Sequence, residues 1–314
     1  MAQPSELRTY ILLNWFSALV CAMAHNFIYF LLGFTNWMFH FMHYFSTFLL
    51  LLLCRCCGQM PRQQLALREF LPLALSQLGV SLLTCYIHNA GKTGALHVLR
   101  ITDGMVTALI LSCGHKLVDT DYFPKTKSHK GLLYLIAFGS SLAWFEFGVW
   151  DYDPIGLALS PLLALLQAVH FLMVFKKFEK LRCHADVFNF YVSGTTSLFL
   201  SVPAFAYTFS NLEMELSELA PAWSFVDYTL LLLGLFFMSG YVYSKYWLLA
   251  NLSPENYATL RHAKYTAAAF GQWSVQTTNG ANFFSVAGKS MATLGLAFYR
   301  WKHYLEGKTS RATF

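Results

Sequence analysis

Two apolar stretches of the sequence carry charged and polar residues at helical spacing. In residues 94–117, His97, Arg100, Asp103 and Thr107 recur every three or four positions, so on a helix they share one face. A charged side chain at the centre of a bilayer costs at least ~2.5–3.5 kcal/mol and is rarely present there without a use. Because Arg presents a planar fork to two oxygens, this cationic face suits the binding of an anion such as phosphate.

The second stretch, residues 254–273, repeats the arrangement near the C-terminus. Tyr257, Arg261 and Lys264 lie on one helical face, and Lys264 follows the Ser253-Pro254 pair by ten residues. That pair predicts a helix N-cap followed by proline at the first helical position. Lys264 has no acid within reach on its own helix, so we expect it to bind a ligand rather than to form a local ion pair.

The composition indicates that these helices belong to a polytopic membrane protein. The chain has 314 residues, of which 56% are hydrophobic and only 12% are charged, whereas soluble proteins carry ~25% charged residues. A helix needs ~20 apolar residues to cross the hydrocarbon core. About ten such spans are predicted, at residues 10–32, 36–54, 70–90, 94–117, 131–150, 155–175, 187–209, 222–250, 254–273 and 283–299.

The placement of the basic residues predicts the orientation of the spans. With ten spans, 16 of the 22 Lys and Arg residues fall on the side of the N-terminus, which the positive-inside rule makes cytosolic together with the C-terminus. Five spans per half predict an inverted repeat, residues 1–150 and 151–314, within one integrated transmembrane domain that ends in a cytosolic tail. Such repeats place the substrate near the midplane. The fourth and ninth spans are equivalents, so we expect their polar faces to meet across a central cavity.

Structural interpretations of the same residues stay open. Arg100 and Asp103 lie three residues apart and could neutralise each other. Arg261 and Lys245 lie nearer the ends of their spans and could extend to the interface. Lys289 could pair with a backbone carbonyl, face water or contact the substrate. We read four glycines as points of close helix packing: Gly79, Gly240, Gly288 and Gly295.

Several classes of function find no support in the sequence. It contains no Walker motif, no H-E-x-x-H motif and no Ser/His/Asp arrangement, so we expect neither an ATP-driven pump nor an enzyme, and no cofactor. His40 and His43 lack a Cys or carboxylate that would complete a metal site. The seven cysteines show no disulfide-framework spacing. The net charge of +6 reflects membrane topology rather than nucleic-acid binding.

Residues 239–264, SGYVYSKYWLLANLSPENYATLRHAK, resemble the eighth and ninth helices of one transporter group. This is the triose-phosphate translocator and nucleotide-sugar transporter group of the drug/metabolite transporter superfamily, in which a tyrosine precedes a Ser-Pro pair and a lysine follows the proline. Tyr241, Pro254 and Lys264 match these positions. Residues 94–110 resemble the fourth-helix pattern of the group, with His97 at its histidine and Arg100 at its lysine.

The chain also departs from the best-known branches of that group. Plastid triose-phosphate translocators carry Lys-Arg in the ninth helix, where this chain has Lys264-Tyr265. The Phe-Asn-Asn and Gly-Ala-Leu-Asn-Lys motifs of GDP-mannose transporters are absent, and Gly104 stands where the group has a proline. The substrate is therefore not fixed by analogy with either branch.

The resemblance and the residues together predict an antiporter of phosphorylated organic anions that works by alternating access. We expect a nucleotide sugar to be exchanged for a nucleoside monophosphate across a Golgi or endoplasmic reticulum membrane. Two alternatives stay open: a sugar-phosphate or phosphoenolpyruvate exchanger of a plastid-type organelle envelope, and a non-transporting scaffold or regulator. The chain could be a monomer or a homodimer. The expected substrate-binding residues are Arg100, Lys264, Tyr241, His97, Thr107, Asp103, Tyr265, Lys289 and Tyr257.

Overall fold

The described part of the chain is helical. The computed structural model describes residues 4–32, 36–90, 95–117, 130–142, 154–215, 224–276 and 283–312, and within them the chain forms α-helices, one short 3-10 turn and no strand. The helices are α1 (Pro4–Leu32), α2 (Asn36–Cys56), α3 (Leu71–Ala90), α4 (Ala95–Leu117), α5 (Lys130–Leu142), α6 (Pro154–Leu181), α7 (Ala185–Glu215), α8 (Phe225–Asn251), α9 (Pro254–Gln276) and α10 (Phe283–Ala312). The all-α prediction is confirmed for these residues.

Each helix covers one of the apolar runs in the sequence. Most begin within three residues of the expected start, while α6, α7 and α10 extend beyond the expected end because the helix continues into polar sequence. The second part of the fifth expected span, residues 143–150, lies outside the described residues. The length of the apolar runs in the sequence thus predicted the positions of the helices.

Side-chain caps fix the start of α8 and α9. Ser224 and Asp227 cap each other at α8: the Asp227 carboxylate accepts from the Ser224 backbone N–H at 2.8 Å, and Ser224 Oγ accepts from the Asp227 N–H at 3.3 Å. At α9, Ser253 Oγ accepts from the Asn256 N–H at 3.2 Å. The predicted N-cap before Pro254 is therefore confirmed, and it sets where the polar face of α9 begins.

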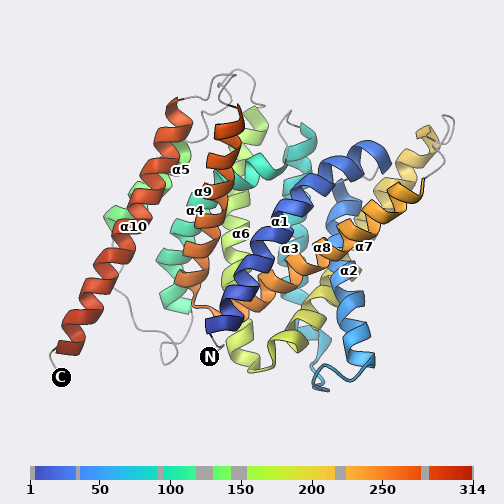
Figure 1. Ribbon diagram of the computed structural model, residues 1–314, viewed down its shortest axis with the longest axis horizontal. Coiled ribbons are helices and arrows are strands. Elements are labelled where there is room, and N and C mark those ends of the chain that lie inside the picture. The colour runs from blue at the N-terminus through green and yellow to red at the C-terminus, as the bar shows by residue number, and fades with distance from the viewer. Residues whose placement is uncertain are drawn as a thin grey trace. The chain divides into compact units, whose positions relative to one another are not determined.

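The chain forms two compact units, and each unit contains helices from both halves of the sequence. The first contains Met1–Leu82 and Lys180–Asn251, and the second contains Leu83–Glu179 and Leu252–Phe314. In the first unit, α1 packs along α8, and α2 packs against both α7 and α8 (Figure 1). In the second, α5 packs along α10, and α4 packs against α5 and α9.

Close approach of helices depends on particular glycines. A Cβ at Gly139 of α5 would lie 2.6 Å from the backbone oxygen of Gly288 and the backbone nitrogen of Ala292 on α10. Gly240 and Gly295 also meet neighbours, since an added Cβ would come within 2.9 Å of Ser17 Oγ and 3.0 Å of Ile136 Cγ1, respectively. Close packing is therefore confirmed at Gly288, Gly240 and Gly295. At Gly79 it is not seen: within the described part of the chain, an added Cβ would meet nothing within 4 Å.

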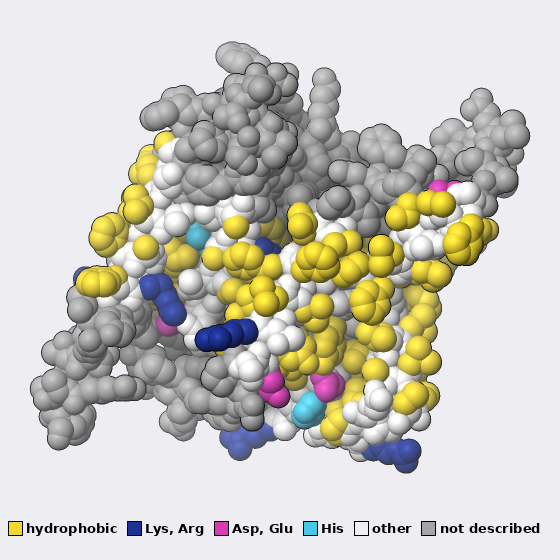
Figure 2. Space-filling model, in the orientation of Figure 1, with side chains coloured by type: hydrophobic (Ala, Val, Ile, Leu, Met, Phe, Trp, Pro, Cys, Tyr) yellow, Lys and Arg dark blue, Asp and Glu magenta, His cyan; other side chains and the backbone are white. Residues whose placement is uncertain are grey.

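The first unit exposes a broad apolar face. Large hydrophobic side chains project outward from α1 and α8, among them Leu12, Phe16, Leu232 and Phe236, each more than half exposed. Figure 2 shows hydrophobic side chains spread over these helices. Such an area on a protein surface suits contact with an apolar phase or partner.

Three helices are long and apolar enough to cross a membrane. Within the described residues they are Trp37–Cys56, Ala158–Leu181 and Phe225–Asn251, that is, most of α2 and α6 and all of α8. By length and composition these helices suit a membrane protein.

Candidate functional site

A buried carboxylate joins α4 to α9. Asp103 of α4 is 2% exposed, and its Oδ1 accepts a hydrogen bond from Arg261 Nη1 at 2.6 Å. Its other oxygen, Oδ2, lies 2.8 Å from His262 Nδ1. Both oxygens of the carboxylate are thus held by side chains of α9. We expected the polar faces of the two helices to meet across a central cavity; at Asp103 they are in direct contact instead.

Arg261 is enclosed by its neighbours. Besides the Asp103 contact, its Nη2 donates to Gln167 Oε1 of α6 at 3.0 Å. The centre of the guanidinium lies 5.3 Å from the Phe171 ring and 5.1 Å from the Tyr265 ring, distances at which a cation is attracted to an aromatic face. Arg261 is 6% exposed, so the alternative that it extends to the interface is wrong.

His262 has one ring nitrogen engaged and the other without a partner. The residue is 5% exposed, and its Nε2 makes no hydrogen bond among the described residues. The Thr107 hydroxyl, one helical turn after Asp103 on α4, is likewise buried without a hydrogen-bond partner in the described part of the chain. Buried polar groups without partners are rare and destabilise by ~1–3 kcal/mol each. Hydrogen-bonding capacity therefore remains at both atoms within the described part of the chain.

Lys264 adds a second cation beside this cluster. It is half-buried, and its Nζ lies 5.1 Å from the Tyr265 ring, the same ring that Arg261 faces. One carboxylate, Asp103, stands against the two cations Arg261 and Lys264. Among the described residues of the cluster, two cations and one carboxylate thus lie close together on α4 and α9.

The remaining residues predicted from the sequence are distributed as follows. Tyr257 is buried and packs against Phe171 and Phe175 of α6, with ring centroids 5.4 Å and 5.8 Å apart. Tyr241 belongs to the first unit, where its ring meets His43 edge-on at 5.9 Å. Three further side chains lie outside the described residues, although their backbones belong to α4 and α10: His97, Arg100 and Lys289.

Sequence reasoning left out three residues that shape the cluster: Gln167, Phe171 and His262. A signal was present for two of them. Gln167 interrupts an otherwise apolar stretch of α6, and His262 follows Arg261 directly within the polar face of α9. For Phe171 no signal was available, because aromatic residues are frequent throughout the chain.

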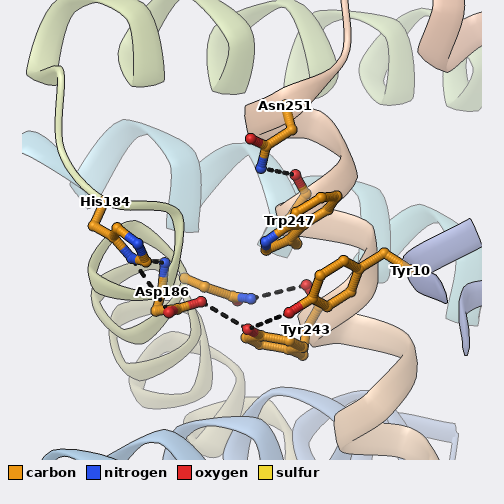
Figure 3. A network of polar contacts seen from close by, with 7 residues as sticks. Tyr10, His184, Asp186, Tyr243, Trp247 and Asn251 are labelled. Carbon is orange, nitrogen blue, oxygen red and sulfur yellow. Dashed lines mark hydrogen bonds and ion pairs between the residues drawn. The ribbon is translucent and has the colours of Figure 1, made fainter. Parts of the chain in front are cut away.

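A second polar cluster holds the first unit together (Figure 3). Tyr243 of α8 donates to Asp186 Oδ1 of α7 at 2.7 Å, and the Tyr10 hydroxyl of α1 lies 3.3 Å from the Tyr243 hydroxyl. Because the hydrogen of Tyr243 goes to the carboxylate, Tyr10 is the donor to Tyr243. The Tyr10 ring also stacks on Trp247 at 3.7 Å. The cluster thus fastens α1, α7 and α8 to one another.

Lys245 of α8 lies among aromatic side chains of the first unit. Its Nζ donates to the Tyr44 hydroxyl at 3.4 Å and lies 4.9 Å from the centre of the Tyr246 ring. In these contacts the Lys245 ammonium faces aromatic side chains inside the first unit.

No protein-family model matches the chain. What the α4–α9 cluster can do follows from its own groups. The carboxylate oxygens contact Arg261 and His262. Two cations beside a single carboxylate, and two buried polar atoms without a hydrogen-bond partner among the described residues, suit an anion with several oxygens.

Proposed function

We propose that the protein is a secondary transporter that exchanges phosphorylated organic anions across a membrane. The proposed exchange is of a nucleotide sugar for a nucleoside monophosphate, in the Golgi or endoplasmic reticulum. The observation that carries the proposal is the buried cluster of α4 and α9, in which Arg261 and Lys264 outnumber Asp103. Intramembrane ionisable residues mark substrate pathways by default. The resemblance of residues 239–264 to the triose-phosphate translocator and nucleotide-sugar transporter group supports a phosphorylated organic anion as the substrate.

Ten membrane spans in an inverted repeat are part of the same proposal. Packing within each unit supports it: α2 packs against α7, α4 against α9 and α5 against α10. In each pair, the second helix is the fifth helix after the first in chain order. Contacts between equivalent helices of the two halves are compatible with an inverted repeat.

The electrostatics of the cluster favour exchange over one-way transport. An empty site with excess positive charge is disfavoured in a low-dielectric interior. A bound anion neutralises that charge, so we expect the loaded site to reorient more readily than the empty one. Phosphate oxygens would contact Lys264, and Arg100 is proposed as a second phosphate ligand from α4.

Ligand-induced thermal stabilisation of the purified protein tests this proposal. The panel is nucleotide sugars, nucleoside mono-, di- and triphosphates, three-carbon sugar phosphates and inorganic phosphate. A ligand at 100 times its Kd stabilises the folded state by ~2.7 kcal/mol, which is readily measured. We expect one nucleotide and its sugar conjugate to raise the Tm, and Lys264→Ala to lose that shift. Lys180→Ala is the matched control, because the Lys180 side chain is 70% exposed.

Other outcomes discriminate among the alternatives. A shift only with three-carbon phosphates would assign the chain to the sugar-phosphate exchangers. No shift with any ligand would contradict transport of phosphorylated anions and leave the scaffold interpretation. A shift that Lys264→Ala and Lys180→Ala retain equally would place the site away from α9.

A further inference from the structure

Within the described residues, only one of the two ring nitrogens of His262 makes a hydrogen bond. Nδ1 contacts Asp103 Oδ2 at 2.8 Å, whereas Nε2 has no hydrogen-bond partner among the described residues, although the residue is 5% exposed. A histidine that served only to hold Asp103 would leave a polar atom buried and unsatisfied. This second nitrogen is therefore the feature of the cluster that the protein itself does not explain.

The Asp103 contact fixes the chemistry of Nε2. An ionised carboxylate only accepts hydrogen bonds, so we assign the hydrogen of this contact to His262 Nδ1. Nε2 is then a lone pair in the neutral ring or an N–H donor in the charged ring. Arg261 holds the other oxygen of Asp103 and is itself fixed by Gln167. Gln167 thus holds Arg261, Arg261 holds Asp103, and Asp103 orients the His262 ring through Nδ1.

A phosphate group complements Nε2 in either protonation state of the ring. Its anionic oxygens accept from an N–H, and a phosphate monoester retains a P–OH donor near its second pKa of ~6. The Thr107 hydroxyl, also buried without a partner in the described residues, offers another donor one turn after Asp103. Lys264 shares the helical face of Arg261 rather than that of His262, with its Nζ 5.1 Å from the Tyr265 ring.

We propose that His262 Nε2 contacts a phosphate group of the transported anion directly, with Asp103 as the positioning residue that holds the ring through Nδ1. Arg261 in turn holds Asp103 in position through its hydrogen bond to Oδ1. This inference rests on the proposed function and adds to it a binding residue from α9 that the sequence resemblance did not supply. It also gives Asp103 a role that does not require an anionic side chain to touch an anionic substrate.

Two substitutions separate the two ring nitrogens. His262→Asn keeps an amide N–H near the position of Nδ1, so the Asp103 contact can remain, and it removes Nε2. His262→Gln places an amide near the position of Nε2 and gives up the Nδ1 contact. His184→Asn is the matched control, because the His184 side chain is 56% exposed and belongs to the first unit.

The test is the Kd of wild type and the three variants for AMP, CMP, GMP, UMP and inorganic phosphate, measured by thermal-shift titration. We expect His262→Asn to keep the unliganded Tm near that of wild type and to bind at least ~tenfold more weakly, which corresponds to ~1.4 kcal/mol. His262→Gln should bind more tightly than His262→Asn, and His184→Asn should bind as wild type does. Equal binding by His262→Asn and wild type, or weaker binding by His262→Gln than by His262→Asn, would overturn the proposal.

A measurement on the wild-type protein covers the case in which both His262 variants fail to fold. The Nε2 resonance of isotope-labelled histidine at position 262 should shift when the ligand with the lowest Kd is added, and an unshifted resonance would overturn the contact. If no probe binds wild type, the proposed function fails and this inference fails with it. If a probe binds wild type and the His262 resonance does not move, only the His262 contact fails.

Discussion

Replacing Asp103 by asparagine should destabilise the protein more than its small change in shape suggests. The substitution keeps the size of the side chain but removes the charge that faces Arg261 Nη1 at 2.6 Å and His262 Nδ1 at 2.8 Å. Arg261 is 6% exposed and cannot reach solvent. The variant therefore removes the carboxylate charge that faces this buried guanidinium.

The expected loss follows from that burial. Removing one partner of a buried ion pair costs ~3–5 kcal/mol. For a chain of this size, 1 kcal/mol changes the Tm by about 2 °C, so Asp103→Asn should lower the Tm in detergent by roughly 6–10 °C. The surface pair Lys180–Glu69, at 3.8 Å with side chains 70% and 27% exposed, provides the control. Glu69→Gln should lower the Tm by no more than about 2 °C, because exposed pairs contribute ~0–1 kcal/mol.

A double substitution tests whether the charge is the cause. Asp103→Asn combined with Arg261→Gln removes both charges, and we expect it to recover part of the Tm lost in Asp103→Asn alone, since the uncompensated cation is gone. Equal Tm values for Asp103→Asn and Glu69→Gln would refute the reasoning. Arg261→Gln alone completes the set. A double variant whose loss of Tm equals the sum of the losses in Asp103→Asn and Arg261→Gln would also refute the reasoning.

Two further predictions concern packing and cysteine reactivity. Gly139→Ala should lower the Tm, because its Cβ would lie 2.6 Å from backbone atoms of α10 and overpacking costs ~1–3 kcal/mol. Gly79→Ala is the control: no atom of the described residues lies within 4 Å of the added Cβ, so the Tm should stay unchanged or rise. Equal losses of Tm would contradict the close approach of α5 and α10. Burial raises the pKa of the Cys183 thiol above its usual range, so in single-cysteine variants at pH 7 a maleimide should label the exposed Cys56 at least ~tenfold faster than Cys183. Both should react alike after denaturation, and equal rates in the folded protein would contradict the burial of Cys183.

The sequence predicted where the helices lie better than how they meet. Long apolar runs locate helices because each run must be long enough to bury or to span, and nearly every helix begins within three residues of the expected position. The pairing of Asp103 was not predicted, because helical periodicity shows which residues share a face but not which helix that face meets. The contact with Arg261 joins residues 158 positions apart, whereas the sequence offered the local neighbour Arg100.

The glycines illustrate the same limit. Gly79 and Gly139 both interrupt apolar helices, and composition alone does not distinguish a glycine at a close approach from one that faces open space. The structure places the contact at Gly139, whereas no described residue comes within 4 Å of a Cβ added at Gly79. The buried Nε2 of His262 is also a property of the assembled helices, since it depends on Asp103 fixing the other ring nitrogen.

Exchange in proteoliposomes tests the central proposal most directly. Purified protein would be reconstituted with or without an internal nucleoside monophosphate, and uptake of the nucleotide sugar with the lowest Kd would be followed in wild type, Lys264→Ala and Lys180→Ala. We predict saturable uptake that requires the internal nucleotide, is lost in Lys264→Ala and is kept in Lys180→Ala. Equal uptake into vesicles with and without internal nucleotide would contradict exchange, and uptake unaffected by Lys264→Ala would contradict the cluster on α9 as the binding site.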